Sequence, residues 1–395
     1  MSDDPFAWQR VLPIDPPFDA AEFAARVAKV RAGMAARGID LLLVASPESV
    51  YFLTGYRTTG YYVYQLFLLP LEGDGIFVTS KLEHSNVRGL AQTPRGLWVS
   101  MADDPVEVTL RAAREAGAES AKGIGYEERG FWMPPQILDG VRAAFPNARS
   151  VPASGVLEDA RRIKSPAEIA CIREAARLAS LGTRAGIAEV APGVTENAIA
   201  GTIYKAMFDE GCEFPSGQPY VVTGPRGALA HMTAERHKVE TRHCVYFEVG
   251  GCFKRYSGSV MRMVSVGPPS DQAKRLAEAS LVALQAAIDA IRPGAISQDV
   301  DRAGRGVIER AGLGQFFHHR FGYSMGIAFP PGWGEGLVMD IAEGNERPLE
   351  PGMAFHLVPN MVVPEFGSMG FSETVLVTEG GNEILTDVLR DFVTV

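Results

Sequence analysis

The sequence predicts an α/β domain over residues 1–160, followed by an α+β domain over residues 161–395. Helical and strand-like segments alternate up to about residue 151, which is typical of small α/β domains. Beyond this point, a pair of helices and a group of strands occur twice in succession. A chain of 395 residues with 46% hydrophobic content can bury a core in each domain.

The first domain begins with a helix that leads into a sheet. Apolar residues recur at helical spacing from Phe18 to Arg37, and the continuous apolar run Leu41–Val44 is typical of a buried strand. The runs Leu66–Leu69 and Ile76–Thr79 predict two more strands. We place the domain boundary at residues 160 and 161, because the segment Leu157–Pro166 is polar and charged.

The second domain is expected to open with a long helix. Ser165 is a good N-cap and Pro166 suits the first helical turn, so we expect a helix from there to about Val190. Further helices are predicted at about 195–210, 270–291 and 297–312, with strands at 244–250, 256–266 and 374–378. This order fits an internally duplicated α+β domain.

Charge and composition exclude several classes of partner. The net charge is −9 and no basic run is present, so we expect neither nucleic acid nor a membrane as partner. The N-terminal Met1–Pro5 lacks the regions of a secretory signal, and no apolar run is long enough to span a bilayer. We therefore expect a cytoplasmic protein. The four cysteines include no CxxC pair and predict reduced thiols.

Five phrases of the second half carry a resemblance: Arg161–Glu168, Val245–Gly250, Gly322–Gly326, Leu349–Met353 and Glu373–Glu379. Together they resemble the superfamily of Xaa-Pro peptidases, methionine aminopeptidase and creatinase, which implies the pita-bread fold. The phrase Tyr51–Tyr56 resembles the N-terminal domain of the creatinase type. The resemblance covers nearly the whole chain.

Metallopeptidases of this superfamily bind two metal ions through two Asp, one His and two Glu, because hard divalent ions prefer carboxylate oxygens. The matching positions here hold Glu248, Ser259, Tyr323, Val358 and Ser372. Glu373 follows the position of the last metal ligand by one residue, and it matches that position only if the alignment is shifted by one residue. The resemblance therefore predicts no metal and no cofactor.

The phrases Phe247–Tyr256, Gly322–Glu335 and Met353–His356 are similar to the ectoine hydrolases, which are related to creatinase and independent of metal. This resemblance implies a metal-independent hydrolase that cleaves a C–N bond in a small amidine, guanidine or cyclic compound, with ectoine as the leading substrate. Two alternatives remain open. One is a metal-dependent Xaa-Pro dipeptidase, and the other is a catalytically inactive pita-bread protein used for binding.

Three residues are candidates for catalysis. The resemblance places His231 at the catalytic histidine of creatinase-like enzymes, where an imidazole can accept a proton from water; the alternative is a surface-loop histidine. Glu248 lies within an apolar strand and predicts a partner, because an unpaired buried carboxylate is costly. The partner is a substrate amidinium, which Glu248 orients or attacks, or else Arg262 or Arg255. Glu373 is a second candidate anchor.

Five residues are expected around the substrate. Tyr323 is predicted to donate a hydrogen bond to the substrate, with simple packing as the alternative. His356 is assigned either to the pocket or to the core. Trp333 and Glu335 follow two prolines in a loop, where an aromatic face and a carboxylate suit a small cation, with simple packing of the loop as the alternative. Phe247 precedes Glu248 in the shared phrase and is also expected to contact the substrate.

The segment from Arg57 to Tyr64 resembles the part of creatinase-type dimers that covers the partner's active site. Strand alternation would place Tyr62 and Tyr64 on one face, with ordinary strand packing as the alternative. The resemblance thus implies a homodimer. The expected substrate is a small molecule that is cationic or zwitterionic.

Overall fold

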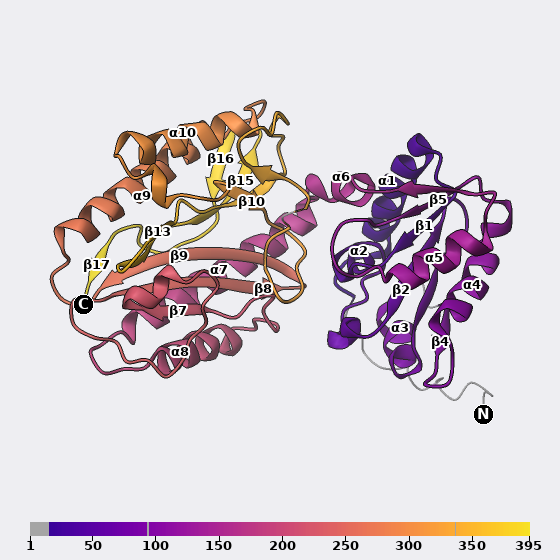
Figure 1. The fold of residues 1–395 in the computed structure, drawn as a ribbon, viewed down its shortest axis with the longest axis horizontal. Coiled ribbons are helices and arrows are strands. Elements are labelled where there is room, and N and C mark those ends of the chain that lie inside the picture. Colours follow the sequence, from indigo (N-terminus) through magenta and orange to yellow (C-terminus); the bar gives the residue numbers. More distant parts are fainter. Residues whose placement is uncertain (1–15, 93–94, 336) are drawn as a thin grey trace. The chain divides into compact units, whose positions relative to one another are not determined.

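A computed structural model describes residues 16–92, 95–335 and 337–395. The chain divides between Arg161 and Arg162 into two units, next to the predicted boundary. Each unit has its own sheets and helices (Figure 1). The segment Met1–Pro5, on which the absence of a secretory signal depends, lies outside the described residues. No helix of the described ranges is both long and apolar enough to cross a membrane.

The first unit is built on a six-stranded mixed sheet with the order β4-β3-β2-β1-β5-β6. The strands β1 and β2 are antiparallel, as are β2 and β3, whereas the remaining pairs are parallel. The bounds of the strands are β1 Leu41–Val44, β2 Gln65–Pro70, β3 Ile76–Ser80, β4 Gly96–Val99, β5 Gly123–Tyr126 and β6 Arg149–Pro152. The three strands predicted in this domain are all present.

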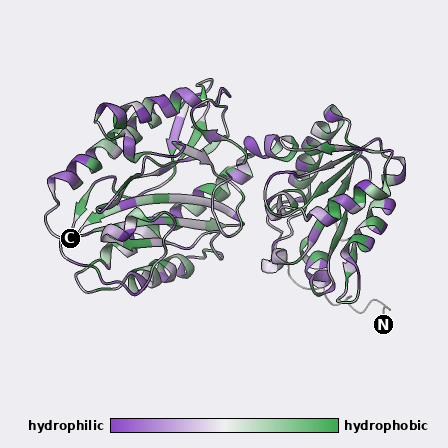
Figure 2. Ribbon diagram, in the orientation of Figure 1, coloured by the Kyte–Doolittle hydropathy of each residue, from purple (hydrophilic) through white to green (hydrophobic). Residues whose placement is uncertain are grey.

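Helices flank this sheet. Their bounds are α1 Ala20–Arg37, α2 Pro47–Thr54, α3 His84–Leu90, α4 Pro105–Glu115, α5 Pro135–Ala144 and α6 Val156–Arg162. Asp19, Ser46 and Asp104 cap α1, α2 and α4 with their side chains, as expected of residues that compete with the backbone for hydrogen bonds. Apolar side chains of α4 and α5 form one core with the sheet, and the sheet strands are correspondingly hydrophobic in Figure 2.

The second unit begins with a helix pair and a four-stranded sheet. The helices are α7 Pro166–Ala188 and α8 Glu196–Asp209, and the strands are β7 Tyr220–Thr223, β8 Cys244–Phe253, β9 Tyr256–Ser265 and β17 Val393–Thr394. A Cβ atom at Gly251 or Gly258 would lie 2.1 or 2.5 Å from the backbone of α7. Glycine at these two positions therefore allows α7 to pack directly on β8 and β9.

A second helix pair and sheet follow, as the predicted duplication requires. The helices are α9 Asp271–Ala290 and α10 Ser297–Arg310. The sheet has the order β11-β10-β12-β15-β16, with β10 Gly322–Ser324, β11 Asp340–Ile341, β12 Ala354–Leu357, β15 Glu373–Thr378 and β16 Gly381–Ile384. A short hairpin joins β13 Met361–Val363 to β14 Gly367–Met369. Figure 1 shows α9 and α10 along one edge of the unit and α8 along the opposite edge.

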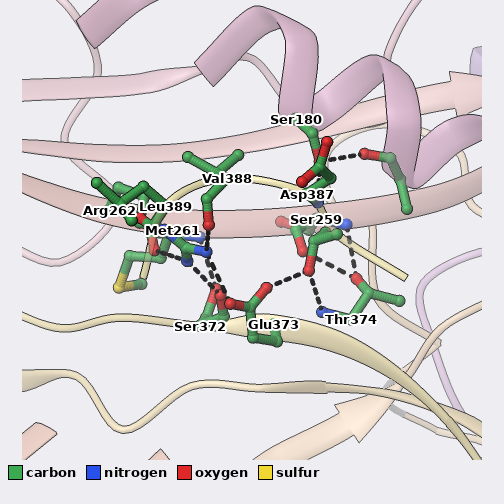
Figure 3. A network of polar contacts seen from close by, with 12 residues as sticks. Ser180, Ser259, Met261, Arg262, Ser372, Glu373, Thr374, Asp387, Val388 and Leu389 are labelled. Atoms are coloured by element: carbon green, nitrogen blue, oxygen red, sulfur yellow. Dashed lines mark hydrogen bonds and ion pairs between the residues drawn. The ribbon is translucent and has the colours of Figure 1, made fainter. Parts of the chain in front are cut away.

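Buried hydroxyl groups connect the two sheets of this unit. The backbone N–H of Ser259 on β9 donates to Thr374 Oγ1 on β15 at 2.9 Å, and Thr374 Oγ1 donates to the carbonyl of Ser259 at 2.8 Å. The N–H of Met261 donates to Ser372 Oγ at 2.6 Å. These bonds, part of the network in Figure 3, hold β15 against β9 and fix the position of its side chains.

Candidate active site

A cavity of about 590 Å³ opens in the second unit, lined by residues from both of its halves. Three predicted site residues line it, namely His231, Glu248 and Tyr323. The other lining residues are Tyr220, Val222, Gly227, Leu229, Ala230, Met232, Tyr246, Met261, His319, Arg320, Asp340, Val358, Asn360, Val362 and Ser368. Pockets of this size commonly hold small molecules.

Glu248 reaches the cavity because of the alternation of β8. Tyr246 and Glu248 point to the cavity side, whereas Phe247 points to the opposite face and is fully buried in the core under α8. The hydroxyl of Tyr246 donates to Glu248 Oε2 at 2.5 Å. Phe247 was predicted to contact substrate; its side chain contributes to the core instead.

The carboxylate of Glu248 forms no ion pair within the described part of the chain. Both predicted arginine partners are engaged elsewhere: Arg262 pairs with Glu373, and Arg255 donates to the carbonyls of Phe214 and Ala328. Burial raises the pKa of Glu248 to about 7, against the smaller opposite effect of the Tyr246 hydrogen bond. The structural alternative, an ion pair with one of these arginines, is therefore absent.

His231 lies in an irregular loop that follows the short helix η5 (Gly224–Ala228). Its ring is exposed, and its centroid lies 6.3 Å from that of Tyr220. The backbone has φ 61°, in the left-handed region that non-glycine residues rarely adopt. Surrounding contacts must hold such a conformation, which is common at functional sites.

A buried carboxylate holds both ends of the His231 loop. Glu196 is fully buried at the start of α8, and its two oxygens accept from the N–H groups of Thr223 and Glu235 at 2.8 and 2.9 Å. Arg226 Nη1 donates to both oxygens at 2.6 Å. One side chain therefore fixes the two ends of the loop and a residue within it.

Replacing Glu196 with alanine is expected to lower the free energy of unfolding by about 3 kcal/mol, because Arg226 Nη1 and two backbone N–H groups lose their acceptor. Urea denaturation measures this loss. Glu210→Ala is the matched control, since Glu210 forms a more exposed ion pair with Arg177 on the same unit and its removal should cost less than about 1 kcal/mol. Equal losses in both variants would contradict the structural role of Glu196.

Tyr323 joins the cavity to a buried chain of hydrogen bonds. Trp333 Nε1 donates to its hydroxyl oxygen at 3.0 Å, and His356 Nδ1 lies 2.8 Å from the same oxygen. His356 Nε2 lies 2.5 Å from Ser372 Oγ. Burial lowers the pKa of His356 to about 3 and raises that of Tyr323 well above its ordinary value. Both groups are therefore neutral at physiological pH.

His356 and Trp333 contact Tyr323 and do not line the cavity. His356 is fully buried on β12, opposite Tyr323 in the β10–β12 register. Trp333 packs against Tyr220, with ring centroids 5.3 Å apart. Trp333 was predicted to bind substrate and His356 to lie either in the pocket or in the core; the structure places both behind the tyrosines that form the cavity wall.

Glu335 is buried in an ion pair. Its Oε2 lies 2.9 Å from Lys164 Nζ, and both side chains are about 1% exposed. Glu335 also accepts from the N–H of Ile327 at 3.0 Å. The predicted contact with a cationic substrate is thus replaced by a contact with a lysine of the same chain, outside the residues that line the cavity.

Glu373 also lies in a buried ion pair. Its Oε1 accepts from Arg262 Nη2 at 2.7 Å, and its Oε2 accepts from the hydroxyl of Thr386. Figure 3 shows Glu373 directed toward Arg262. Its neighbour Ser372 bonds to His356. Ser372 is thus linked to Tyr323 through His356, whereas Glu373, predicted to act in catalysis, is paired within the chain and is not among the residues that line the cavity.

The two tyrosines predicted to share a strand face are separated in the first unit. Tyr62 ends the short helix η2 (Thr59–Tyr62) and is 78% exposed. Tyr64 is packed against the core, and its hydroxyl lies 2.6 Å from Thr109 Oγ1. The strand begins only at Gln65, so the predicted alternation does not apply to this segment.

The donors around Tyr323 do not fit a pair of hard divalent ions. Of the five positions that carry metal ligands in the resembling metallopeptidases, only Glu248 presents a carboxylate to the cavity. Ser259 Oγ donates to the carbonyl of Val249, and Ser372 Oγ bonds to His356. Nowhere in the described residues do three or more His, Cys, Asp or Glu side chains gather in an arrangement suited to a metal.

Several lining residues were not predicted from the sequence. Tyr246 could have been found, because strand alternation places it beside Glu248. Arg320 and Asp340 form an ion pair at 3.3 Å, and the guanidinium of Arg320 lies 4.9 Å from the ring centroid of Tyr323. No local sequence signal identifies this pair, because its members come from different segments of the second unit.

Known proteins resemble the chain over almost its whole length. An ectoine hydrolase of Halomonas elongata is 29% identical over 95% of this chain and 97% of its own. A Xaa-Pro dipeptidase of Pyrococcus horikoshii is 26% identical over 93% of this chain and 98% of its own. The crystal structure of a prolidase from Thermococcus sibiricus matches 95% of this chain and 100% of its own, with 25% identity and a TM-score of 0.86.

The family models agree with these likenesses. Residues 26–163 match the creatinase/prolidase N-terminal domain, and residues 170–379 match metallopeptidase family M24. The predicted α/β domain and pita-bread domain are confirmed by the matching prolidase fold. The chain belongs to metallopeptidase family M24 and carries a creatinase-type N-terminal domain.

Proposed function

We propose that this protein is a metal-independent hydrolase that cleaves a C–N bond in a small amidine, guanidine or cyclic compound, with ectoine as the leading substrate. The observation that carries this proposal is the carboxylate of Glu248. It faces the cavity together with His231 and forms no ion pair with a cation of the described residues. A buried carboxylate of this kind favours a cationic ligand.

The named relatives support the reaction class. The ectoine hydrolase and the Xaa-Pro dipeptidase are both hydrolases that act on C–N bonds. The dipeptidase reaction in this superfamily uses two metal ions, and the donors at the matching positions here do not suit them. The donor set therefore favours chemistry by side chains. A homodimer remains a prediction from the resemblance, and a cytoplasmic location remains a prediction from the sequence.

Two residues that line the cavity, Glu248 and His231, have separate roles in the proposed reaction. The ionised carboxylate of Glu248 binds the amidinium of the substrate and orients its carbon. His231, on the exposed side of the cavity, accepts a proton from water as the water oxygen bonds to that carbon. The C–N bond then breaks, and His231 returns the proton to the released nitrogen. Water is thereby added across one C–N bond, with no change in oxidation state.

The test combines elemental analysis with product analysis. The purified protein is examined for metal by elemental mass spectrometry and then incubated with ectoine, hydroxyectoine, creatine and a Xaa-Pro dipeptide. We expect turnover of ectoine or a related amidine that persists after treatment with a chelator. Stoichiometric metal together with dipeptide hydrolysis that a chelator abolishes would overturn the proposal in favour of a dipeptidase. Absence of turnover on all four compounds would favour a binding protein.

A further inference from the structure

Four side chains form a hydrogen-bonded chain that runs from the cavity wall into the core. Trp333 Nε1 donates to Tyr323 Oη, which bonds to His356 Nδ1, and His356 Nε2 bonds to Ser372 Oγ. Ser372 Oγ also accepts from the backbone N–H of Met261 at 2.6 Å. Only Tyr323 among these residues lines the cavity.

The direction of each bond follows from the number of available protons. A neutral imidazole has one N–H donor and one acceptor nitrogen. If Nδ1 carries the proton, His356 donates to Tyr323 and accepts from the hydroxyl of Ser372. Tyr323 Oη then accepts from both Trp333 and His356. Its own hydrogen then has no acceptor among these four side chains, and Tyr323 is the member of the chain that lines the cavity.

The other tautomer leaves a buried donor without an acceptor. If Nε2 carries the proton, Ser372 Oγ accepts from both His356 and Met261. The hydrogen of Ser372 then has no acceptor among the hydrogen bonds of residues 16–92, 95–335 and 337–395, although Ser372 is fully buried. An unsatisfied buried hydroxyl costs about 1–3 kcal/mol. The Nδ1–H tautomer is therefore favoured.

We propose that Tyr323 is a catalytic residue that presents its hydroxyl hydrogen to the substrate, and that His356 and Ser372 are positioning residues that fix this direction through one imidazole tautomer. This role rests on the proposed hydrolysis. Tyr323 donates a hydrogen bond to the substrate nitrogen that gains electron density as its bond to carbon breaks. Tyr323 keeps its proton throughout, so the proton balance of the reaction is unchanged.

The tautomer can be tested in the free protein. In protein labelled with nitrogen-15 histidine, we expect His356 to show a protonated Nδ1 and an unprotonated Nε2, with its signals assigned by their loss in His356→Gln. Ser372→Thr should retain this tautomer, and Ser372→Ala should lose the preference for it. Thr374→Val is the matched control, because it removes a buried hydroxyl two residues further along the chain that bonds to Ser259. A protonated Nε2 in the unmodified protein would overturn the proposal.

Kinetics test the catalytic part separately. Tyr323→Phe is expected to lower kcat on ectoine by about 10²-fold or more with little change in KM, as for other donors to a transition state. Ser372→Ala should lower kcat by less, and Ser372→Thr should restore it. Unchanged kcat in Tyr323→Phe would overturn the catalytic role. Failure of the unmodified protein to hydrolyse any substrate would overturn the proposed function, while the tautomer would still decide the direction of the Tyr323 donor.

Discussion

Replacing Glu248 with glutamine is expected to lower kcat/KM on ectoine by about 10²–10³-fold, because a neutral amide cannot pair with the amidinium and loss of a buried charge pair costs about 3–4 kcal/mol. His231→Ala should lower kcat by about 10²–10⁴-fold through loss of the general base. Glu350→Gln is the matched control, since Glu350 pairs with Arg162 away from the cavity lining. Rates close to those of the unmodified protein in either variant would contradict the role of that residue.

The raised pKa of Glu248 predicts the pH dependence of this activity. The carboxylate must be ionised to bind a cation, so kcat/KM should increase as the pH rises through about 7. The effect of rising pH on the stability of the fold has the opposite sign. The folded protein retains this proton to higher pH than the unfolded chain, whose ordinary value is 4.5, so the contribution of Glu248 weakens the fold as the pH rises from 4.5 to about 7. Glu248→Gln should remove both effects.

Replacing Arg262 with methionine is expected to lower the free energy of unfolding by about 3–5 kcal/mol, because it leaves the buried carboxylate of Glu373 unpaired. The arginine is about 1% exposed and donates to Glu373 and to four backbone carbonyls, those of Met261, Ser372, Val388 and Leu389. Figure 3 shows these contacts of Arg262 with its neighbours. Chemical denaturation measures the loss.

The control for Arg262 is a salt bridge on the surface of the same unit. Arg173 pairs with Glu383, and both side chains are more than 40% exposed, so Arg173→Met should cost less than about 1 kcal/mol. The double variant Arg262→Met with Glu373→Leu should recover part of the loss, since the unpaired carboxylate is then absent. A loss in Arg262→Met as small as that in Arg173→Met would contradict the structural assignment of the pair.

Local signals predicted the elements of the fold well. The Ser165 cap and Pro166 set the start of α7 at the expected residue, and the apolar run of β1 was found with its bounds unchanged. The sequence also indicated that Glu248 needs a polar partner, because an isolated carboxylate in an apolar strand is costly to bury, and the hydroxyl of Tyr246 donates to it in the structure. Each of these features depends on residues close together in the chain.

The partners of the other carboxylates could not be predicted in this way. Glu335 is paired with Lys164, and Glu373 with Arg262, through contacts between residues more than 100 positions apart. A local pattern shows that a buried carboxylate needs a cation, and it does not show whether the protein or the substrate supplies it. The prediction that Tyr62 and Tyr64 share a strand face was wrong for a different reason, because a short helix occupies residues Thr59–Tyr62.

The hydroxyl groups that join β9 to β15 also determine how the site is assembled. Ser259 and Ser372 stand at two positions that hold metal ligands in the resembling metallopeptidases, and both are occupied here by hydrogen bonds to the chain itself. Every partner in these contacts is encoded in the polypeptide. The geometry of this part of the site is therefore set by contacts within the polypeptide itself.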